Sequence, residues 1–294
     1  MRIATFTLAG PTRIGVVQGE EIIDVTATDT NIPADMRAFL EMGDDAFRAA
    51  LDAERSATRF PLAEVRLEAP IRAPRKFLGL GLSFKSHLAE VRARGVPITI
   101  PPHQIWFNKQ VSCVNGPYDP IHLPSASNQL DYEGEVALVI GKRARHVGRA
   151  DAGKVIAGYL VCNDVSVRDW QLRSPTAMLG KSFDTHGPIG PWLTTADEIE
   201  NPEALRIRTW VDGELRQDGN TSDFIYSIGE MIEELTMVFT LEPGDILATG
   251  TPPGVGGLMD PPRFLDSGQT VRVEVDGLGY IENRVIDEPG IAFG

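Results

Sequence analysis

The stretch LDYEGEVALVIGK, residues 130–142, contains the pattern that decides the fold of this chain. Residues 136–140 form a continuous apolar run of the kind found in fully buried strands, and Gly141 ends it. Two carboxylates, Glu133 and Glu135, precede the run with one glycine between them. Alternate strand side chains point to the same face, so both carboxylates would lie side by side at the edge of a core. Like charges this close disfavour each other's ionised form, so the pair needs a compensating partner.

Composition limits the class of protein and its partners. The 294 residues are enough for one large domain, or for one domain and a small module, and 42% are hydrophobic. No apolar run approaches the ~18 residues of a membrane span, and residues 1–15 make a poor signal peptide. Two cysteines are too few for a disulfide framework, so we expect a soluble, cytoplasmic protein without a membrane partner. The net charge of -13 argues against a nucleic-acid partner but leaves anionic small substrates open.

Glycine and proline separate many short apolar runs, which is typical of a strand-rich chain with many turns. Residues 1–25 predict a small meander of strands. Residues 33–60 carry apolar side chains at helical spacing, with a break at Gly43. The prolines that follow mark a boundary. We therefore expect a small N-terminal domain, residues 1–70, and a larger domain, residues 71–294, that carries the candidate catalytic residues.

Strands also dominate the larger domain, where the predicted helices are few and short. Hairpins are predicted at the Asp-Gly pairs 212–213 and 276–277. Residues 227–245 predict an amphipathic helix with one apolar stripe, which we assign to the core. The stripe consists of Ile228, Met231, Ile232, Leu235, Val238 and Phe239. We expect a mostly β (α+β) fold with short peripheral helices rather than an alternating α/β sheet.

A divalent cation would relieve the repulsion between Glu133 and Glu135. Hard cations such as Mg²⁺ or Mn²⁺ prefer carboxylate oxygens and keep positions open for water or substrate. A third carboxylate, Asp164, ends the apolar run GYLVCND and completes a candidate metal site. In the alternative interpretation, the glutamates flank a strand end in solvent, and Asp164 caps the helical turn that follows it.

His87 and Glu90 form a candidate acid–base pair in the segment SFKSHLAE. They are three residues apart, so on a helix they share one face, and the carboxylate would orient the imidazole and raise its basicity. Such a pair suits a general base that activates water. The alternative is an exposed pair on an ordinary helix, which the spacing alone favours. Of the other histidines, only His186 lies in a loop of interest, GKSFDTHGPIGP.

Two loops rich in glycine and proline are further candidates. The tripeptide Gly-Lys-Ser at 180–182 ends like a phosphate-binding loop, but Pro175 stands where that loop needs a glycine, so we reject it. Lys181 remains a candidate for pairing with a substrate carboxylate or an enolate. In residues 250–257, GTPPGVGG, the backbone N–H groups and the Thr251 hydroxyl are candidates for binding an anion. A serine hydrolase would lack its nucleophile, because no G-x-S-x-G motif is present.

From about residue 70 to its C-terminus, the chain resembles the fumarylacetoacetate hydrolase family. Five segments occur in the order and spacing seen there: GLGLSFKSHLAE, DYEGEVALVIGK, GYLVCNDVSVRDWQ, GKSFDTHGPIGPW and GDILATGTPPGVG. The resemblance implies a β-rich roll or mixed sheet sandwich with a small N-terminal module, and a homodimer. It also implies a Mg²⁺ or Mn²⁺ ion held by the residues that match the family's Glu-x-Glu and Asp. These are Glu133, Glu135 and Asp164.

The resemblance further implies roles for the other candidate residues. By this resemblance His87 and Glu90 would be the catalytic pair that activates water, and Lys181 would stabilise developing negative charge. Residues at three more positions would contact substrate or complete the site: Arg168, Gln171 and Thr251.

The chain departs from the family's common pattern G-L-N-Y-x-x-H just before the candidate histidine. Ser83, Phe84 and Ser86 stand at positions where many members carry other residues. The departure bears on the identity of the substrate more than on the chemistry. Residues 92–105, which follow, read as a mobile segment able to close over a substrate.

The implied activity is metal-dependent cleavage of a C–C bond in a 2,4-dioxo acid. Water activated by the histidine pair would attack the 4-carbonyl of this acylpyruvate-type substrate and release pyruvate and a carboxylic acid. The same site would also suit decarboxylation of an oxaloacetate-like acid, or a proton shift in an unsaturated 2-oxo diacid. A non-catalytic binding protein is a further alternative, but such a protein has little need of His87 and Glu90 beside a metal.

Overall fold

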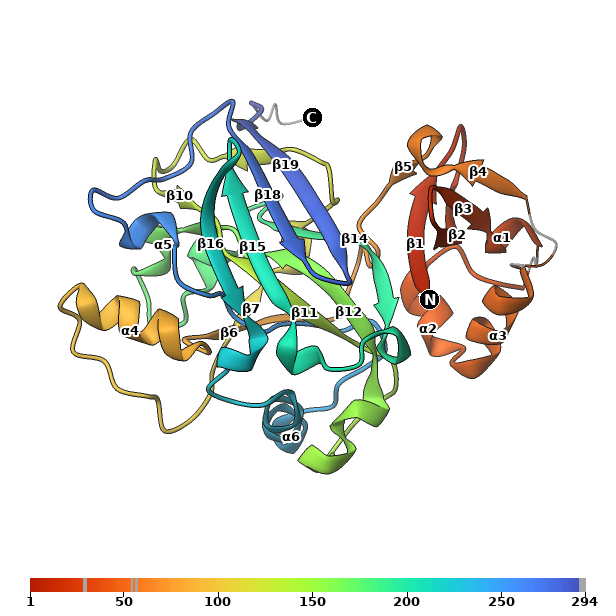
Figure 1. Ribbon diagram of the computed structural model, residues 1–294, viewed down its shortest axis with the longest axis horizontal. Coiled ribbons are helices and arrows are strands. Elements are labelled where there is room, and N and C mark those ends of the chain that lie inside the picture. Colours follow the sequence, from red (N-terminus) through yellow and green to blue (C-terminus); the bar gives the residue numbers. More distant parts are fainter. Residues whose placement is uncertain (29–30, 54, 56–57, 291–294) are drawn as a thin grey trace.

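The structure is a computed structural model that describes residues 1–28, 31–53, 55 and 58–290 (Figure 1). Its strands form one sheet of 12 strands, one of five and a two-stranded pair, and its helices are short. The predicted mostly β fold with peripheral helices is confirmed. Residues 291–294 of the predicted larger domain lie outside the described part of the chain. No helix in the described part combines the length and apolar character needed to cross a lipid bilayer.

An antiparallel meander forms the N-terminal part of the chain, as predicted for residues 1–25. Its strands pair in chain order, and Gly43, with φ +61°, separates the two longer helices that cover it. The Asp35 side chain begins the first of these helices by accepting a hydrogen bond from the N–H of Ala38. The elements are β1 (Arg2–Thr7), β2 (Thr12–Gln18), β3 (Glu21–Asp24), α1 (Val25–Thr28), α2 (Met36–Glu41), α3 (Asp44–Ala53), β4 (Arg59–Pro61) and β5 (Arg66–Leu67).

The meander continues into the rest of the large sheet, because β1 pairs antiparallel with β14. The strands beyond β1 follow in the order β14 (Gly187–Thr195), β12 (Ile156–Asn163), β11 (Gly134–Ile140), β17 (Ile246–Ala248), β6 (Phe77–Gly81) and β7 (Ile105–Lys109), and β8 (Val114–Asn115) pairs with β14. β11 contains the apolar run that opened the sequence, and every one of its residues is buried. It has a strand on each side in the sheet, and its two faces pack into different hydrophobic cores, which explains why the run is continuous rather than alternating.

A five-stranded sheet packs over β11 and forms the main core with it (Figure 1). The predicted hairpins at 212–213 and 276–277 are both present in this sheet. Asp212 and Gly213 both have positive φ, as a two-residue hairpin turn requires. The strand order is β16 (Glu214–Asn220), β15 (Arg206–Val211), β18 (Thr270–Val275), β19 (Gly279–Asp287) and β9 (Ile121–Leu123).

The helices of the larger part lie at the periphery (Figure 1). The predicted amphipathic helix is α6 (Ile228–Val238), which begins with reciprocal hydrogen bonds between Ser227 and Glu230. The predicted stripe is wrong at Val238, which is 68% exposed. Phe239 leaves the helical conformation, with φ -146° and ψ 167°, and packs against the core. The remaining α-helices are α4 (Lys85–Ala93) and α5 (Arg168–Gln171).

Short connecting elements complete the fold. A two-stranded pair, β10 (Leu130–Asp131) with β13 (Ser166–Val167), lies beside the start of β11 and the end of β12. The 3-10 helices are η1 (Leu62–Glu64), η2 (Val111–Cys113), η3 (Arg149–Val155), η4 (Met178–Lys181), η5 (Ala196–Glu198), η6 (Pro202–Ala204), η7 (Thr221–Asp223) and η8 (Gly256–Leu258).

Candidate active site

The three predicted metal ligands converge where β11 meets β12. The two strands pair antiparallel, with Gly134 opposite Asn163, so the start of β11 lies beside the end of β12. This pairing brings Glu133 and Glu135 next to Asp164. One carboxylate oxygen from each lies within 4.8 Å of the others, and all three side chains are buried. The alternative in which the glutamates face solvent is therefore wrong.

Two buried lysines surround Asp164. Lys109 Nζ donates to its Oδ1 at 2.6 Å, and Lys181 Nζ donates to its Oδ2 at 2.7 Å. Lys181 Nζ also donates to Glu133 Oε2 at 2.6 Å, while Lys109 Nζ donates to the backbone oxygen of Lys181 at 2.6 Å. Burial by itself would lower the pKa of Lys109, but the Asp164 carboxylate outweighs burial and raises that pKa. Both oxygens of Asp164 thus bind lysines, rather than capping the turn that follows.

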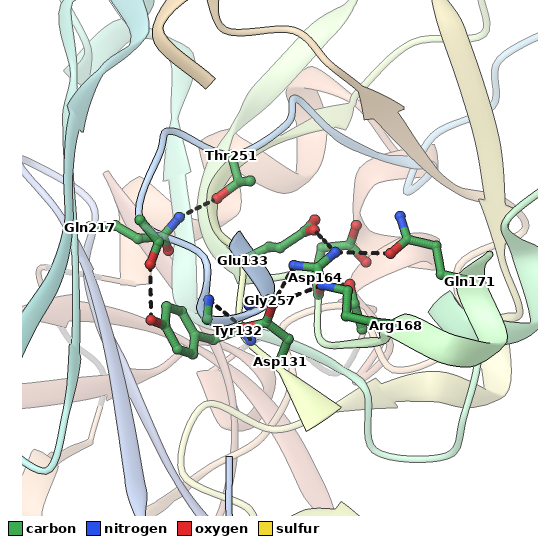
Figure 2. Close-up of polar contacts among 12 residues, drawn as sticks. Asp131, Tyr132, Glu133, Asp164, Arg168, Gln171, Gln217, Thr251 and Gly257 are labelled. Carbon is green, nitrogen blue, oxygen red and sulfur yellow. Dashed lines mark hydrogen bonds and ion pairs between the residues drawn. The ribbon is translucent and has the colours of Figure 1, made fainter. Parts of the chain in front are cut away.

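Arg168, at the start of α5, is the third cation of the site. Its Nε donates to Asp131 Oδ2 at 2.8 Å, and its Nη1 donates to Glu133 Oε1 at 2.5 Å and Gln171 Oε1 at 2.9 Å (Figure 2). The pairing of β10 with β13 accounts for this placement, because it aligns the residues before Glu133 with those before Arg168. Arg168 and Gln171, both predicted to contact substrate, therefore lie together beside the acidic cluster.

The two glutamates have opposite electrostatic surroundings. Burial would raise the pKa of Glu133, but Lys181 and Arg168 together lower it to about 2. Burial raises the pKa of Glu135 well above its usual value, and the nearby charges of Asp164 and Glu133 raise it further. Within the described residues, no lysine or arginine forms an ion pair with Glu135. Among the described contacts, Glu135 is therefore the one carboxylate of the three without a cationic partner, and its raised pKa favours the neutral form.

This set of donors fits a divalent cation. Four buried carboxyl groups, those of the three predicted ligands and Asp131, face three cations, so the ionised form of one of them, Glu135, has no cation among the described residues to balance it. Buried carboxylate oxygens of this kind suit a hard cation such as Mg²⁺ or Mn²⁺, and a bound ion would favour the ionised form of Glu135. The residues that would hold it are Glu133, Glu135 and Asp164.

The predicted acid–base pair lies on α4. His87 Nδ1 and Glu90 Oε2 are 2.8 Å apart, and their side chains are 12% and 20% exposed. Phe84, just before the helix, is buried against Phe224 with ring centroids 4.9 Å apart, which anchors the start of α4. The pair is therefore mostly shielded from solvent, unlike the exposed pair of the alternative interpretation.

The loop at residues 250–257 joins the acid–base pair to the acidic cluster. Four of its backbone N–H groups bind carboxylates of the chain itself, so these four are not available to the ligand anion predicted for this loop. These bonds connect both ends of the site through one short segment. The pairs are Gly250 with Glu135 at 2.8 Å, Gly254 with Glu90 at 2.9 Å, and Gly256 and Gly257 with the two oxygens of Asp131, both at 2.8 Å.

Thr251 contacts the segment between the two glutamates. Its Oγ1 donates to the Gly134 backbone oxygen at 3.0 Å and accepts from Gln217 Nε2 at 2.8 Å (Figure 2). With this contact, hydrogen bonds link all nine residues singled out in the sequence into one site. They are His87, Glu90, Glu133, Glu135, Asp164, Arg168, Gln171, Lys181 and Thr251.

Three residues of this network were missed in the sequence. Lys109 ends a strand with a charge next to an apolar run, the same signal that singled out Asp164. Asp131 precedes Glu133 by two residues, so the alternation that joined the glutamates also included it. Gln217 gave no signal, because its segment reads as an ordinary hairpin strand.

Of the positions that depart from the family pattern, Ser83 and Phe84 are buried and Ser86 is exposed. Ser83 Oγ donates to the backbone oxygen of Thr249 at 2.6 Å, and the backbone N–H of Ser86 donates to Asp223 Oδ2 at 2.8 Å. The segment 92–105 lies between α4 and β7 and contacts the region of α6 through two side chains. Tyr226 Oη donates to the backbone oxygen of Pro101 at 2.6 Å, and Gln104 Nε2 donates to that of Glu230 at 3.0 Å.

His186 is buried away from solvent, and its Nε2 lies 2.8 Å from the backbone oxygen of His122. Burial lowers the pKa of His186 to about 3, so its imidazole is neutral near pH 7. A neutral ring bonded to the backbone fits a structural role for the one other histidine of interest.

Comparison with known proteins assigns the family. The family model for the fumarylacetoacetate (FAA) hydrolase C-terminal domain matches residues 76–286, and the one described as Rv2993c-like, N-terminal, matches residues 1–70. The chain is 42% identical over 279 residues to a protein of Xenopus laevis named oxaloacetate tautomerase fahd2, mitochondrial, covering 93% of this chain and 86% of the relative.

Solved structures agree with this assignment. Maleylpyruvate hydrolase from Sphingobium sp. SYK-6, in complex with a manganese(II) ion and pyruvate, is 34% identical, with a TM-score of 0.83 over 98% of this chain and 100% of that one. A 5-carboxymethyl-2-hydroxymuconate delta-isomerase from Mycobacterium smegmatis is 30% identical, with a TM-score of 0.77 over 99% and 100%. The chain belongs to the fumarylacetoacetate hydrolase family, and it is an enzyme of that family. Its relatives include hydrolases, tautomerases and isomerases.

Proposed function

We propose that this enzyme uses a divalent metal and the His87–Glu90 pair to interconvert the keto and enol forms of an oxaloacetate-like 2-oxo diacid. The observation that carries the proposal is the shielded acid–base pair, joined by one loop to a buried acidic cluster. Tautomerisation is preferred because the Xenopus relative of that name is 42% identical along most of both chains.

The metal would be Mg²⁺ or Mn²⁺, held by Glu133, Glu135 and Asp164. When bound, it would supply Lewis acidity toward the oxygens of the 2-oxo acid. The ammonium group of Lys181 lies between Glu133 and Asp164. It would supply a positive charge that stabilises negative charge developing on the substrate. Arg168 and Gln171, one turn apart on α5, would orient a substrate carboxylate.

His87 would move the proton. If its Nδ1 carries the proton and donates to Glu90, Nε2 is free to act as the base. Nε2 takes a proton from C3 of the keto form, and the C–H electron pair becomes the C2–C3 double bond while the π pair of the C2 carbonyl moves onto its oxygen. The imidazolium of His87 then returns the proton to that oxygen to give the enol. Glu90 stabilises the imidazolium formed in between. No atom is gained or lost overall, and because a catalyst does not change the equilibrium, the enzyme speeds both directions by the same factor.

Hydrolysis of a C–C bond in a 2,4-dioxo acid is the second candidate. The similarity to maleylpyruvate hydrolase supports it, and the His87–Glu90 pair equally suits activation of a water molecule. This reaction would release pyruvate and a carboxylic acid. Decarboxylation of an oxaloacetate-like acid at the same site is a third possibility, which would release carbon dioxide.

One experiment separates these reactions. Oxaloacetate in its enol form is added to the enzyme with Mg²⁺ or Mn²⁺, and the ultraviolet absorbance of the enol is followed before and after chelation. We expect metal-dependent acceleration of the decay while total oxaloacetate stays constant. Equimolar pyruvate and carbon dioxide would instead identify a decarboxylase. No acceleration, with stoichiometric pyruvate from acetylpyruvate in a parallel assay, would establish the hydrolase and contradict tautomerisation.

A further inference from the structure

Gln217 connects the two sheets at the metal site, although it belongs to neither the acidic cluster nor the acid–base pair. It lies on β16, opposite Thr209 of β15, and it is 1% exposed. Burying a carboxamide is unfavourable unless its polar atoms are bonded. The side chain leaves the five-stranded sheet and reaches the start of β11 and the loop at residues 250–257 (Figure 2).

All polar groups of this side chain are engaged with the protein. Oε1 accepts from the backbone N–H of Gly134 at 2.9 Å. Nε2 donates to Thr251 Oγ1 and to the backbone oxygen of Pro252, both at 2.8 Å. Both N–H groups are used, so Gln217 has no donor left for a substrate. Gln217 must therefore affect the metal site through the groups that its side chain binds, which are Gly134, Thr251 and Pro252.

Those groups lie at the centre of the site. Gly134 is the residue between Glu133 and Glu135, and Thr251 donates back to its backbone oxygen, so both polar groups of Gly134 are bonded. The neighbouring N–H of Gly250 donates to Glu135. Gln217 thereby closes a ring of hydrogen bonds that fixes the distance between the glutamates and the loop.

We propose that Gln217 is a positioning residue that sets the geometry of the cation site by tying Gly134 to Thr251 and Pro252. The inference rests on the proposed function to the extent that Glu133, Glu135 and Asp164 hold the cation. An amide is the side chain that the ring requires, because only an amide accepts from one backbone N–H and donates to two oxygens. A methionine has a similar size but offers neither strong donor nor strong acceptor.

The test is the affinity of the protein for Mn²⁺ and Mg²⁺, measured by titration calorimetry on wild type and on Gln217→Met. Groups that orient metal ligands typically contribute 10–100-fold to metal affinity, so we expect the Kd of Gln217→Met to rise by roughly 10-fold or more. Turnover of Gln217→Met is measured in parallel. It should be low at limiting metal and should recover at least in part at saturating metal.

Asn283→Leu is the matched control. Asn283 is also a buried amide of the five-stranded sheet, and its Nδ2 donates to the backbone oxygens of Gly116 and Asp119 at 3.1 and 2.7 Å. This variant should lose thermal stability as well, but its metal affinity should match that of wild type. Equal losses of affinity in both variants, or unchanged affinity in Gln217→Met, would overturn the inference.

Two further measurements keep the outcome decisive. If Gln217→Met does not fold, Gln217→Asn keeps the amide but is one methylene too short to reach Gly134 and Pro252 together, and its metal affinity should fall in the same way. If wild type itself binds neither ion, the proposed function fails. Amide hydrogen exchange at Gly134, Gly250, Thr251 and Gly254 then tests the ring alone, with faster exchange expected in Gln217→Met than in Asn283→Leu.

Discussion

Glu133 and Glu135 tolerate each other because the protein treats them differently. Lys181 and Arg168 neutralise Glu133, while Glu135 accepts only a backbone hydrogen bond from Gly250 among the contacts described. A metal ion would therefore compensate the charge of Glu135, while Lys181 and Arg168 already compensate that of Glu133. The sequence pattern predicted a cation alone, because Arg168 and Lys181 lie 35 and 48 residues from Glu133 along the chain, and strand alternation reveals no contact at that separation.

Lys109 should contribute more to stability than an exposed lysine does. Lys109→Met leaves one oxygen of buried Asp164 without its ammonium partner, and we expect the free energy of unfolding to fall by about 3 kcal/mol. Urea unfolding without metal measures the loss. Lys154→Met is the control, since Lys154 pairs with Asp151 at the surface and should change stability little. Equal, small losses in both variants would show that the buried pair is not needed.

His87 should be required for turnover but not for metal binding. We expect His87→Ala to lower kcat by roughly 10²–10⁴-fold, because it removes the general base, and to leave the Kd for Mn²⁺ unchanged. Glu90→Gln, which keeps the shape of the side chain that orients His87, should cause a smaller loss. The enol absorbance assay and calorimetry measure the two effects. Full activity in His87→Ala would exclude His87 as the base.

At the scale of elements, antiparallel pairing assembles the acidic cluster. Glu133 and Asp164 are far apart in sequence, yet Gly134 opposite Asn163 makes them neighbours. Packing of the five-stranded sheet over β11 explains the glycine between the glutamates. A Cβ atom at Gly134 would lie 2.2 Å from Thr209 Oγ1 and 3.0 Å from Val273 Cγ1, so the five-stranded sheet leaves no room for a side chain there.

Gly134→Ala should therefore destabilise the protein by about 1–3 kcal/mol, the usual cost of adding volume to a packed core. Thermal unfolding compared with wild type measures it. Gly148→Ala is the control, because Gly148 has φ -73° and nothing within 4 Å of an added Cβ. If both variants unfold at the wild-type temperature, the close approach of the two sheets at Gly134 is not a constraint.

At the scale of the molecule, one sheet runs from the N-terminal meander into the larger part. β1 pairs with β14, and residues on both sides of residue 70 share a hydrophobic core that includes Ile3, Ile14, Val139 and Leu160. The predicted division into residues 1–70 and 71–294 stays a prediction. Because strand pairing and the hydrophobic core cross residue 70, we expect each part to depend on the other for its stability.

The pH dependence of global stability should include a contribution from buried His186. Its pKa is lowered from 6.5 to about 3, so between these values the unfolded chain binds a proton that the folded protein does not. The free energy of unfolding should therefore fall with acidification through this range, by about 1.4 kcal/mol per pH unit from this group. His186→Gln, which keeps a donor for the His122 backbone, should lose that slope in urea unfolding at several pH values. If the free energy of unfolding depends on pH in the same way in wild type and His186→Gln, the lowered pKa of His186 is contradicted.

The cytoplasmic location, the 2-oxo acid as small-molecule partner, and the absence of nucleic-acid and membrane partners stay predictions. The homodimer implied by the family resemblance is also a prediction, and it can be tested directly. Light scattering after gel filtration should give twice the chain mass of 32.1 kDa. A single-chain mass across the working concentration range would show a monomer and would leave the site, which lies within one chain, unaffected.

The sequence by itself determined the features that depend on near neighbours along the chain. Strand alternation placed the glutamates of EGE together, helical spacing paired His87 with Glu90, and Asp-Gly pairs marked both hairpins, because backbone geometry sets these relations over a few residues. Tertiary structure alone decided which distant groups meet. Lys109 at Asp164, Gln217 across the two sheets and the exposure of Val238 follow from strand order and packing, which no local pattern encodes.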